Sequence, residues 1–124
     1  MPINLWPNFD VGQAPRSPKS VTEEAGSGLS ERTGGRIAFW TLGTSMNHAL
    51  VDVEFSLYVP TLQYHYPFMR IQFAVNHFYP VRIFADNSQE ITASDEMKLT
   101  VELEKIFNAP STVKTIQGLL AITQ

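Results

Sequence analysis

The residue types in this chain that could carry chemistry are, first, its three histidines, His48, His65 and His77. The 124-residue sequence contains no cysteine, so these imidazoles are the strongest candidate metal ligands and proton carriers. His65 and His77 flank one predicted strand, whose ends are separated by roughly 33 Å when extended, so they cannot share a metal ion. His48 and His77 could reach the same end of a sheet, with Asp86 less well placed. Loop histidines of this kind usually lie in solvent, and we expect no metal site and no catalytic histidine.

Asp52 and Glu54 form the second candidate pair. They lie two residues apart on one face of a predicted strand, so their Cα atoms are separated by about 7 Å. Two carboxylates at such a spacing can act together in hydrolysis. Arg70 and Arg82 share their outward orientation on neighbouring strands, and cross-strand ion pairing accounts for the acids without catalysis. The sequence favours this structural interpretation.

Motifs of common enzyme and binding classes are missing from the sequence. We find no glycine-rich phosphate loop with its lysine, no Gly-x-Ser-x-Gly and no His-Glu-x-x-His. The net charge is −3 and the basic residues are scattered, which argues against a nucleic-acid surface. No run approaches the roughly 20 apolar residues of a membrane span. We expect no cofactor, no nucleic acid and no membrane, and a cytoplasmic location, because Met1 to Phe9 do not resemble a secretory signal.

Aromatic residues gather around two of the histidines. Such residues can stack on nucleobases when cations lie nearby, but tyrosine-rich surfaces more often contact proteins, and packing within the fold is a third explanation. The members of this sequence cluster are Tyr58, Tyr64, Tyr66, Phe68, Phe78 and Tyr79, with His65 and His77 between them.

The elements that must position these residues are three predicted strands between residues 49 and 85. In each strand apolar and polar residues alternate, which indicates one buried and one exposed face and is typical of an antiparallel sheet. The inward residues are Val51, Val53, Phe55, Leu57 and Val59, then Met69, Ile71, Phe73 and Val75, then Tyr79, Val81, Ile83 and Ala85. Parity requires a three- or five-residue loop or a bulge between the last two strands. Pro80 lacks an amide hydrogen, so the last strand should lie at a sheet edge.

The segment before these strands reads as an arm, a helix and a first strand. Residues 1–16 form the predicted extended arm, whose Trp6 and Phe9 either lie across the domain or dock on a partner. Ser17-Pro18 is a helix start and Gly34-Gly35 a helix end. Gly26 and Gly28 within the helix allow a close approach to the sheet, or else mark a hinge. Residues 36–42 are apolar on both faces and predict the first strand, followed by a turn over residues 43–47.

The C-terminal segment predicts two helices. Strict alternation over residues 97–103 also fits a strand, but Leu99, Leu103 and Ile106 follow helical spacing, with Ser94 as a possible N-cap and Pro110 just beyond the end. A second helix is predicted from Ser111 to about Ile122. Its inward residues are Val113, Ile116, Leu119 and Leu120. Residues 17–124 should therefore form a single α+β domain, a four-stranded antiparallel meander with an N-terminal helix and two C-terminal helices packed on one face.

The apolar residues left on the outer face suggest a function. Trp40, Leu42, Phe68 and Phe84 all have outward parity, and a monomer rarely exposes several such residues together. We therefore predict a small non-enzymatic binding or assembly module that acts through protein contacts as a homo-oligomer. The alternative is a small enzyme or ligand-binding domain with a pocket between sheet and helices. A buried Asp or Glu close to a His or Tyr in a concave site would identify that alternative.

Overall fold

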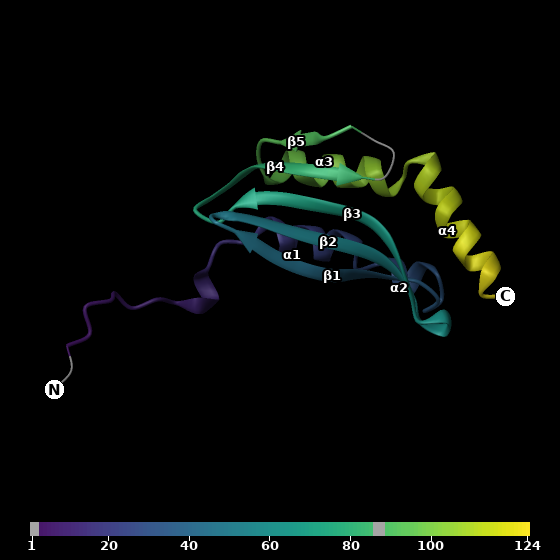
Figure 1. Cartoon of the computed structure of the whole chain (residues 1–124), viewed down its shortest axis with the longest axis horizontal. Coiled ribbons are helices and arrows are strands. Elements are labelled where there is room, and N and C mark those ends of the chain that lie inside the picture. Colours follow the sequence, from purple (N-terminus) through teal and green to yellow (C-terminus); the bar gives the residue numbers. More distant parts are fainter. Residues whose placement is uncertain (1–2, 86–88) are drawn as a thin grey trace.

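A curved antiparallel sheet forms the body of the domain in a computed structural model, which describes residues 3–85 and 89–124 (Figure 1). Its strands follow one another in chain order, so the predicted meander and α+β class are confirmed. The structure adds one strand to the predicted four. The strands are β1 (Ala38–Asn47), β2 (Leu50–Val59), β3 (Tyr64–Ala74), β4 (His77–Ala85) and β5 (Ile91–Ala93). The predicted break at Asp86-Asn87-Ser88 lies outside the described residues.

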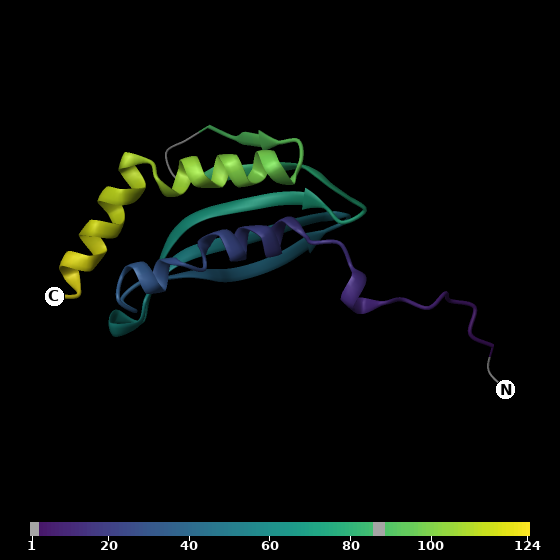
Figure 2. The same ribbon diagram turned by 180° about the vertical axis from the view of Figure 1, so that it is seen from behind.

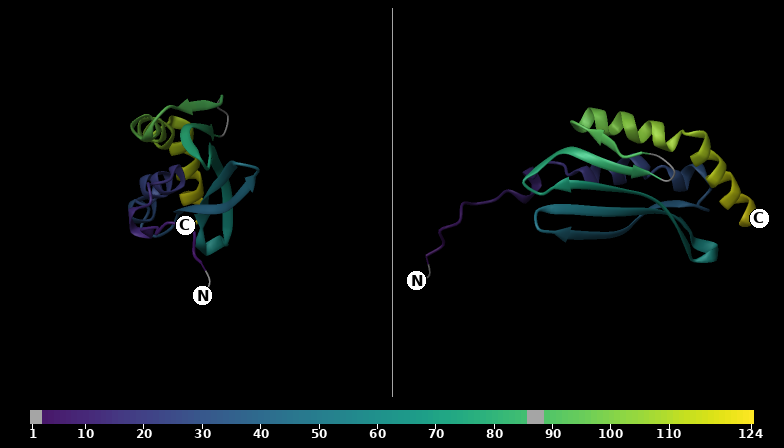
Figure 3. Two further views of the ribbon diagram at one scale, coloured as in Figure 1. Left: turned by 90° about the vertical axis from the view of Figure 1, so that its left-hand side faces the viewer. Right: turned by 45° about the horizontal axis from the view of Figure 1, so that its top comes forward.

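The helices lie on one face of this sheet, with α1 and α3 side by side and α4 turning off at an angle from the end of α3 (Figures 1 and 2). The end-on view of Figure 3 shows α1 and α3 on the same side of the strands. The helix from Ser111 to Ile122 exists as predicted, but Val113 is 41% exposed and not inward. The reason is that this helix meets the core through Leu119, which is buried. The α-helices of the described residues are α1 (Pro18–Gly26), α2 (Leu29–Arg32), α3 (Glu96–Phe107) and α4 (Pro110–Ile122), and short 3-10 helices cover Val11–Gln13 and Pro60–Leu62.

The first helix begins where the sequence predicts. The Ser17 hydroxyl accepts a hydrogen bond from the Ser20 amide at 3.1 Å, and Pro18 occupies the first helical position. The predicted single helix breaks at Ser27, whose hydroxyl donates to the Glu24 carbonyl at 2.8 Å, and resumes as α2. A short side-chain hydroxyl that competes for helical carbonyls favours such an end.

Gly26 is the point at which α1 comes closest to the sheet. A Cβ at this position would lie 2.2 Å from the ring of Phe39, which itself stacks on Phe55 at 5.1 Å between centroids. Nothing lies within 4 Å of a Cβ placed on Gly28. Gly26 therefore allows the close approach of helix and sheet that the sequence predicted. Gly28 does not, because a side chain at this position would meet no neighbouring atom.

This difference predicts opposite effects for two identical substitutions. Gly26→Ala should lower the free energy of unfolding by about 1–3 kcal/mol, because the added methyl overlaps an aromatic ring that is packed on both sides. Gly28→Ala should leave it unchanged or raise it by up to about 1 kcal/mol, through reduced entropy of the unfolded chain. Urea denaturation midpoints measure both, and equal losses at the two sites would contradict the packing argument.

The buried face of the sheet is the predicted one. The odd-numbered residues of β2 from Val51 to Val59 are all at most 7% exposed, and Ile71, Val81 and Ile83 are fully buried. Helix α3 covers them with Leu99, Leu103 and Ile106, so the helical interpretation of residues 97–103 is confirmed. Its N-cap is Asp95, which accepts from the Lys98 amide at 2.7 Å, and not Ser94.

The one-faced burial gives a second prediction. Phe55→Ala and Phe73→Ala should each cost about 3–5 kcal/mol of unfolding free energy, because both rings are at most 5% exposed. Glu54→Ala, on the opposite face of β2, should change it by no more than about 1 kcal/mol. Denaturant midpoints for the three variants are the measurement, and similar losses at all three positions would argue against a one-faced core.

Three register shifts modify the simple alternation. In β1 the shift falls between Thr41 and Gly43, so Leu42 occupies a bulge. The strand continues to Asn47, and the predicted turn over residues 43–47 is wrong, because the bulge absorbs the change of parity. The turn is His48-Ala49, with His48 in the left-handed region at φ 59°.

The second shift reverses the predicted orientation of Phe68. Phe55 pairs with Met69 while Ser56 pairs with Pro67, which leaves Phe68 between the two pairs. Its ring is 7% exposed and lies edge-on to Phe39 at 6.3 Å. The outward orientation predicted for Phe68 is therefore wrong, because a bulge moves the residues beyond it to the other face.

The third shift, in β4, confirms the bulge that parity required. Ala74 pairs with His77, and the next pair is Gln72 with Arg82, so four residues of β4 lie opposite one of β3. Val75 therefore lies in the turn and is half exposed. Pro80, preceded by a cis peptide bond, falls in this unpaired stretch. β4 is not the edge predicted from Pro80, because β5 pairs with Val81–Ile83 beyond it.

Candidate functional site

The open edge of the sheet at β1 is the most distinctive surface of the domain. β1 is ten residues long and pairs on one side only, with β2, whereas the opposite edge is the three-residue β5. β1 contains no charged residue and no proline. Soluble proteins usually protect their edge strands with lysine, proline or short length, because unpaired backbone groups can pair with another chain. Here only the bulge at Leu42 interrupts the edge.

Apolar side chains follow this edge. Trp40 is 48% exposed, Leu42 42% and Met46 59%. We call the backbone of Ala38–Asn47 together with these three side chains the β1 edge. Of the four predicted interface residues, Trp40 and Leu42 belong to it, while Phe68 lies in the core. Phe84 is partly covered, since the Arg70 guanidinium lies 4.3 Å above its ring.

Trp40 is also part of an aromatic cluster on the outer face. Its ring centroid lies 5.3 Å from that of Tyr58, and Tyr58 stacks on His65 at 4.4 Å. The Nδ1 atom of His65 lies 2.9 Å from the Ser56 hydroxyl oxygen, which fixes the imidazole against β2. The aromatic group seen in the sequence is thus divided, because Phe78 instead packs edge-on against the core residue Phe73 at 5.7 Å.

The polar part of the outer face is occupied by ion pairing. Arg70 lies 2.7 Å from the Asp52 carboxylate, and the Gln72 amide donates to the same oxygen at 3.0 Å. The predicted cross-strand role of Asp52 is confirmed. Arg82 pairs elsewhere, with Glu90 at 3.5 Å, because β3 lies between its strand and that of Asp52 and β5 lies on its other side. Since its carboxylate is held by two donors, Asp52 is poorly suited to act as an acid or a base.

The histidines are placed as the sequence suggested. His48 and His77 lie at the same end of the sheet, where the Val75 amide donates to the Ala49 carbonyl at 2.8 Å, and both are exposed. His65 lies at the far end of β3. Asp86, their possible companion, is outside the described residues. Among residues 3–85 and 89–124 there is no group of three or more His, Asp or Glu side chains that could hold a metal ion.

A groove of about 550 Å³ lies between α1, α2, α4 and the sheet. Its lining includes the aromatic rings of Phe39, Phe68 and Phe107 and the polar residues Arg32, Asn108 and Thr112. No Asp, Glu, His or Tyr lines it. A second groove of about 320 Å³, on the other side of the α3–α4 junction, contains Glu102 and Lys105, which pair with each other at 3.5 Å. Tyr66 lines this second groove together with Glu102, so the groove contains both residue types of the enzymatic alternative, but the Glu102 carboxylate is engaged by Lys105. No histidine lines either groove.

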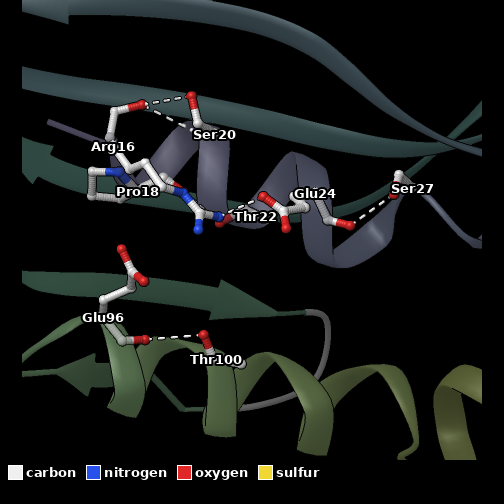
Figure 4. A network of polar contacts seen from close by, with 9 residues as sticks. Arg16, Pro18, Ser20, Thr22, Glu24, Ser27, Glu96 and Thr100 are labelled. Carbon is white, nitrogen blue, oxygen red and sulfur yellow. Dashed lines mark hydrogen bonds and ion pairs between the residues drawn. The ribbon is translucent and has the colours of Figure 1, made fainter. Parts of the chain in front are cut away.

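The first turns of α1 and α3 meet at a group of charges that the sequence did not reveal. Figure 4 shows Glu96 at the start of α3 and Arg16 just before α1, where Arg16 pairs with Glu24 at 2.6 Å. The Tyr79 hydroxyl is buried, and no described residue forms a hydrogen bond with it. Burial raises the pKa of Tyr79, the negative charges of Glu96 and Asp95 raise it further, and Arg16 opposes them.

The unpartnered hydroxyl predicts an unusual response to Tyr79→Phe. The unfolding free energy should stay the same or rise by about 1–2 kcal/mol at neutral pH, because a buried hydroxyl without a partner is destabilising. Tyr64→Phe, at a residue 46% exposed, should change little and serves as the control. A loss of more than about 1 kcal/mol for Tyr79→Phe would show that the hydroxyl has a partner.

The raised pKa also predicts a pH dependence. Above the ordinary tyrosine pKa of about 10, the unfolded chain loses the Tyr79 proton before the folded protein does. The folded state then binds more protons, so stability should fall as pH rises through this window. Tyr79→Phe should remove this part of the loss in pH-dependent urea titrations, whereas Tyr64→Phe should retain it.

In the part of the chain that the structure describes, no helix has both the length and the hydrophobicity needed to cross a bilayer. Comparisons of the chain with protein-family models, with curated proteins and with solved structures found no match. The surfaces that could carry a function are the β1 edge, the aromatic cluster beside it and the two grooves described above.

Proposed function

We propose that this protein is a non-enzymatic assembly module that associates with itself through protein contacts at the β1 edge. The observation that carries the proposal is a ten-residue edge strand with no charged residue and no proline. Strand pairing at such an edge supplies backbone hydrogen bonds without any change in the fold of the domain. The expected cytoplasmic location belongs to the same proposal.

The side chains at this edge support association as well. Trp40 and Leu42 would lose their exposed surface on strand addition, and aromatic side chains of this size contribute strongly to interfaces. The aromatic contacts of Trp40 with Tyr58 and His65 hold its ring in place before binding, which lowers the entropy lost on association. Enzymatic function is less well supported. Asp52 is engaged by Arg70, Glu102 is engaged by Lys105 in the groove that it shares with Tyr66, and no histidine lines either groove.

A second candidate function is the binding of an apolar small molecule in the 550 Å³ groove. Its volume lies in the range of ligand pockets, and three aromatic residues line it. Such a ligand would stabilise the monomer without changing its mass, so thermal shifts and light scattering distinguish the two candidates.

Introducing a charged residue into the β1 edge tests the assembly proposal. Thr44 pairs with Val53 and is exposed in the single chain, but an added strand would bury its side chain. Thr44→Lys should therefore weaken self-association by about tenfold or more, because an inward charge on an edge strand opposes further pairing. Gln117→Lys, which adds the same charge on the exposed face of α4, is the matched control.

Light scattering at tens of micromolar protein gives the answer. The unmodified chain and Gln117→Lys should have at least twice the 13.9 kDa chain mass, and Thr44→Lys should approach the monomer. An unmodified chain that is monomeric under these conditions would overturn the proposal. Unchanged circular dichroism of Thr44→Lys would show that the domain itself remains folded.

A further inference from the structure

We propose that the N-terminal arm, residues 3–11, of one copy adds as a strand to the β1 edge of a second copy. This inference rests on the proposed self-association and names the segment that occupies the edge. It assigns a place to the one part of the described chain that lies apart from the folded domain.

The arm extends away from the folded domain (Figures 1 and 3). Its hydrogen bonds are local, such as the Trp6 amide to the Asn4 side chain and the Gly12 amide to Asp10. Its large apolar residues are all between 72% and 87% exposed, namely Ile3, Leu5, Trp6, Phe9 and Val11. The arm therefore does not lie across its own domain, which was one of the two arrangements predicted for it. So many exposed apolar residues in one segment indicate a binding segment.

The sequence of the arm fits a strand. Its odd positions carry Ile3, Leu5, Pro7, Phe9 and Val11, whereas three of the four even positions between them are Asn4, Asn8 and Asp10. This period of two places Ile3, Leu5, Phe9 and Val11 on one face of an extended segment and Trp6 on the other. Nine residues span about 30 Å, close to the roughly 33 Å of the ten-residue β1.

Pro7 is compatible with an edge position. Alternate residues of a strand direct their amides to opposite sides, so a strand paired on one side only tolerates proline where the amide would point away. With Pro7 facing away from β1, the even residues Asn4, Trp6, Asn8 and Asp10 supply the amides for pairing. The added strand would then present a proline at the new edge, which limits further pairing.

The direction of the chain favours a second copy over the arm's own domain. α1 runs antiparallel to β1, since Glu23 accepts from the Thr41 hydroxyl and Gly26, further along α1, lies against Phe39. The arm precedes α1, so folded back on its own domain it would run parallel to β1. Every strand pair in this sheet is antiparallel, the arrangement with the more stable hydrogen bonds. An arm from a second copy can adopt that direction.

The two partners also match in chemistry. β1 has no charge, and the arm between Ile3 and Val11 has only Asp10. The apolar face of the arm would lie beside Trp40 and Leu42, which are half exposed in the single chain. Reciprocal exchange of two arms between two copies closes a two-fold dimer in which both edges are covered.

The test uses two full-length double variants of equal charge and opposite parity. Leu5→Asp with Phe9→Asp places both charges on the apolar face of the proposed strand. Asn4→Asp with Asn8→Asp places the same two charges on the other face, at residues that stay polar. The first should raise the dissociation constant of the dimer by about 100-fold or more, as for hot-spot residues, and the second by less than about tenfold. Light scattering over a dilution series, compared with the unmodified chain, measures both.

The outcomes separate this inference from the proposed function. A monomeric Leu5→Asp/Phe9→Asp variant beside a dimeric Asn4→Asp/Asn8→Asp variant supports the arm as the added strand. If both variants remain dimeric, the arm is not the occupant and the inference is overturned while self-association stands. If the dimers of both variants dissociate equally, the alternation of apolar and polar residues in the arm does not matter for binding. Addition of the arm as a strand is then overturned. A monomeric unmodified chain overturns the inference together with the proposed function.

Discussion

The packing of Phe39 between Gly26 and Phe55 is the contact on which the rest of the structure depends. Phe39 stacks on Phe55 at the centre of the buried face, and α1 can reach this ring only because position 26 has no side chain. Phe68 and Phe107 then pack edge-on against the same ring at 6.3 and 5.5 Å. One close approach thereby joins α1, three strands and the end of α3 into a common core.

The register shifts decide which apolar residues this core can accept. A strand side chain has only two faces available, and one additional residue transfers everything beyond it to the other face. At Phe68 the shift brings a large ring into the core. At Leu42 it leaves an apolar side chain on the exposed edge. The same local irregularity therefore contributes to stability in β3 and to the exposed surface in β1.

The exposed apolar surface is consequently not spread over the outer face of the sheet. The middle of that face is neutralised by Asp52, Arg70 and Gln72, and Phe84 lies under the Arg70 guanidinium. What remains open is the β1 edge, where unpaired backbone groups and half-exposed side chains occur together. A free edge and a free apolar arm in one chain are complementary, which is the physical basis for the proposed assembly.

The sequence by itself determined the elements whose signal is local. Ser17-Pro18 specified the start of α1, the odd residues of β2 specified the buried face, and Leu99, Leu103 and Ile106 specified α3, because capping and periodicity depend only on neighbours along the chain. Parity also required the irregularity in β4. Tertiary structure alone decided the bulges at Leu42 and Phe68, the pairing of β5, the angle between α3 and α4 and the burial of the Tyr79 hydroxyl. Each of these depends on which residues meet across strands or between helices, and residues far apart in the sequence leave no local pattern that would record such a meeting.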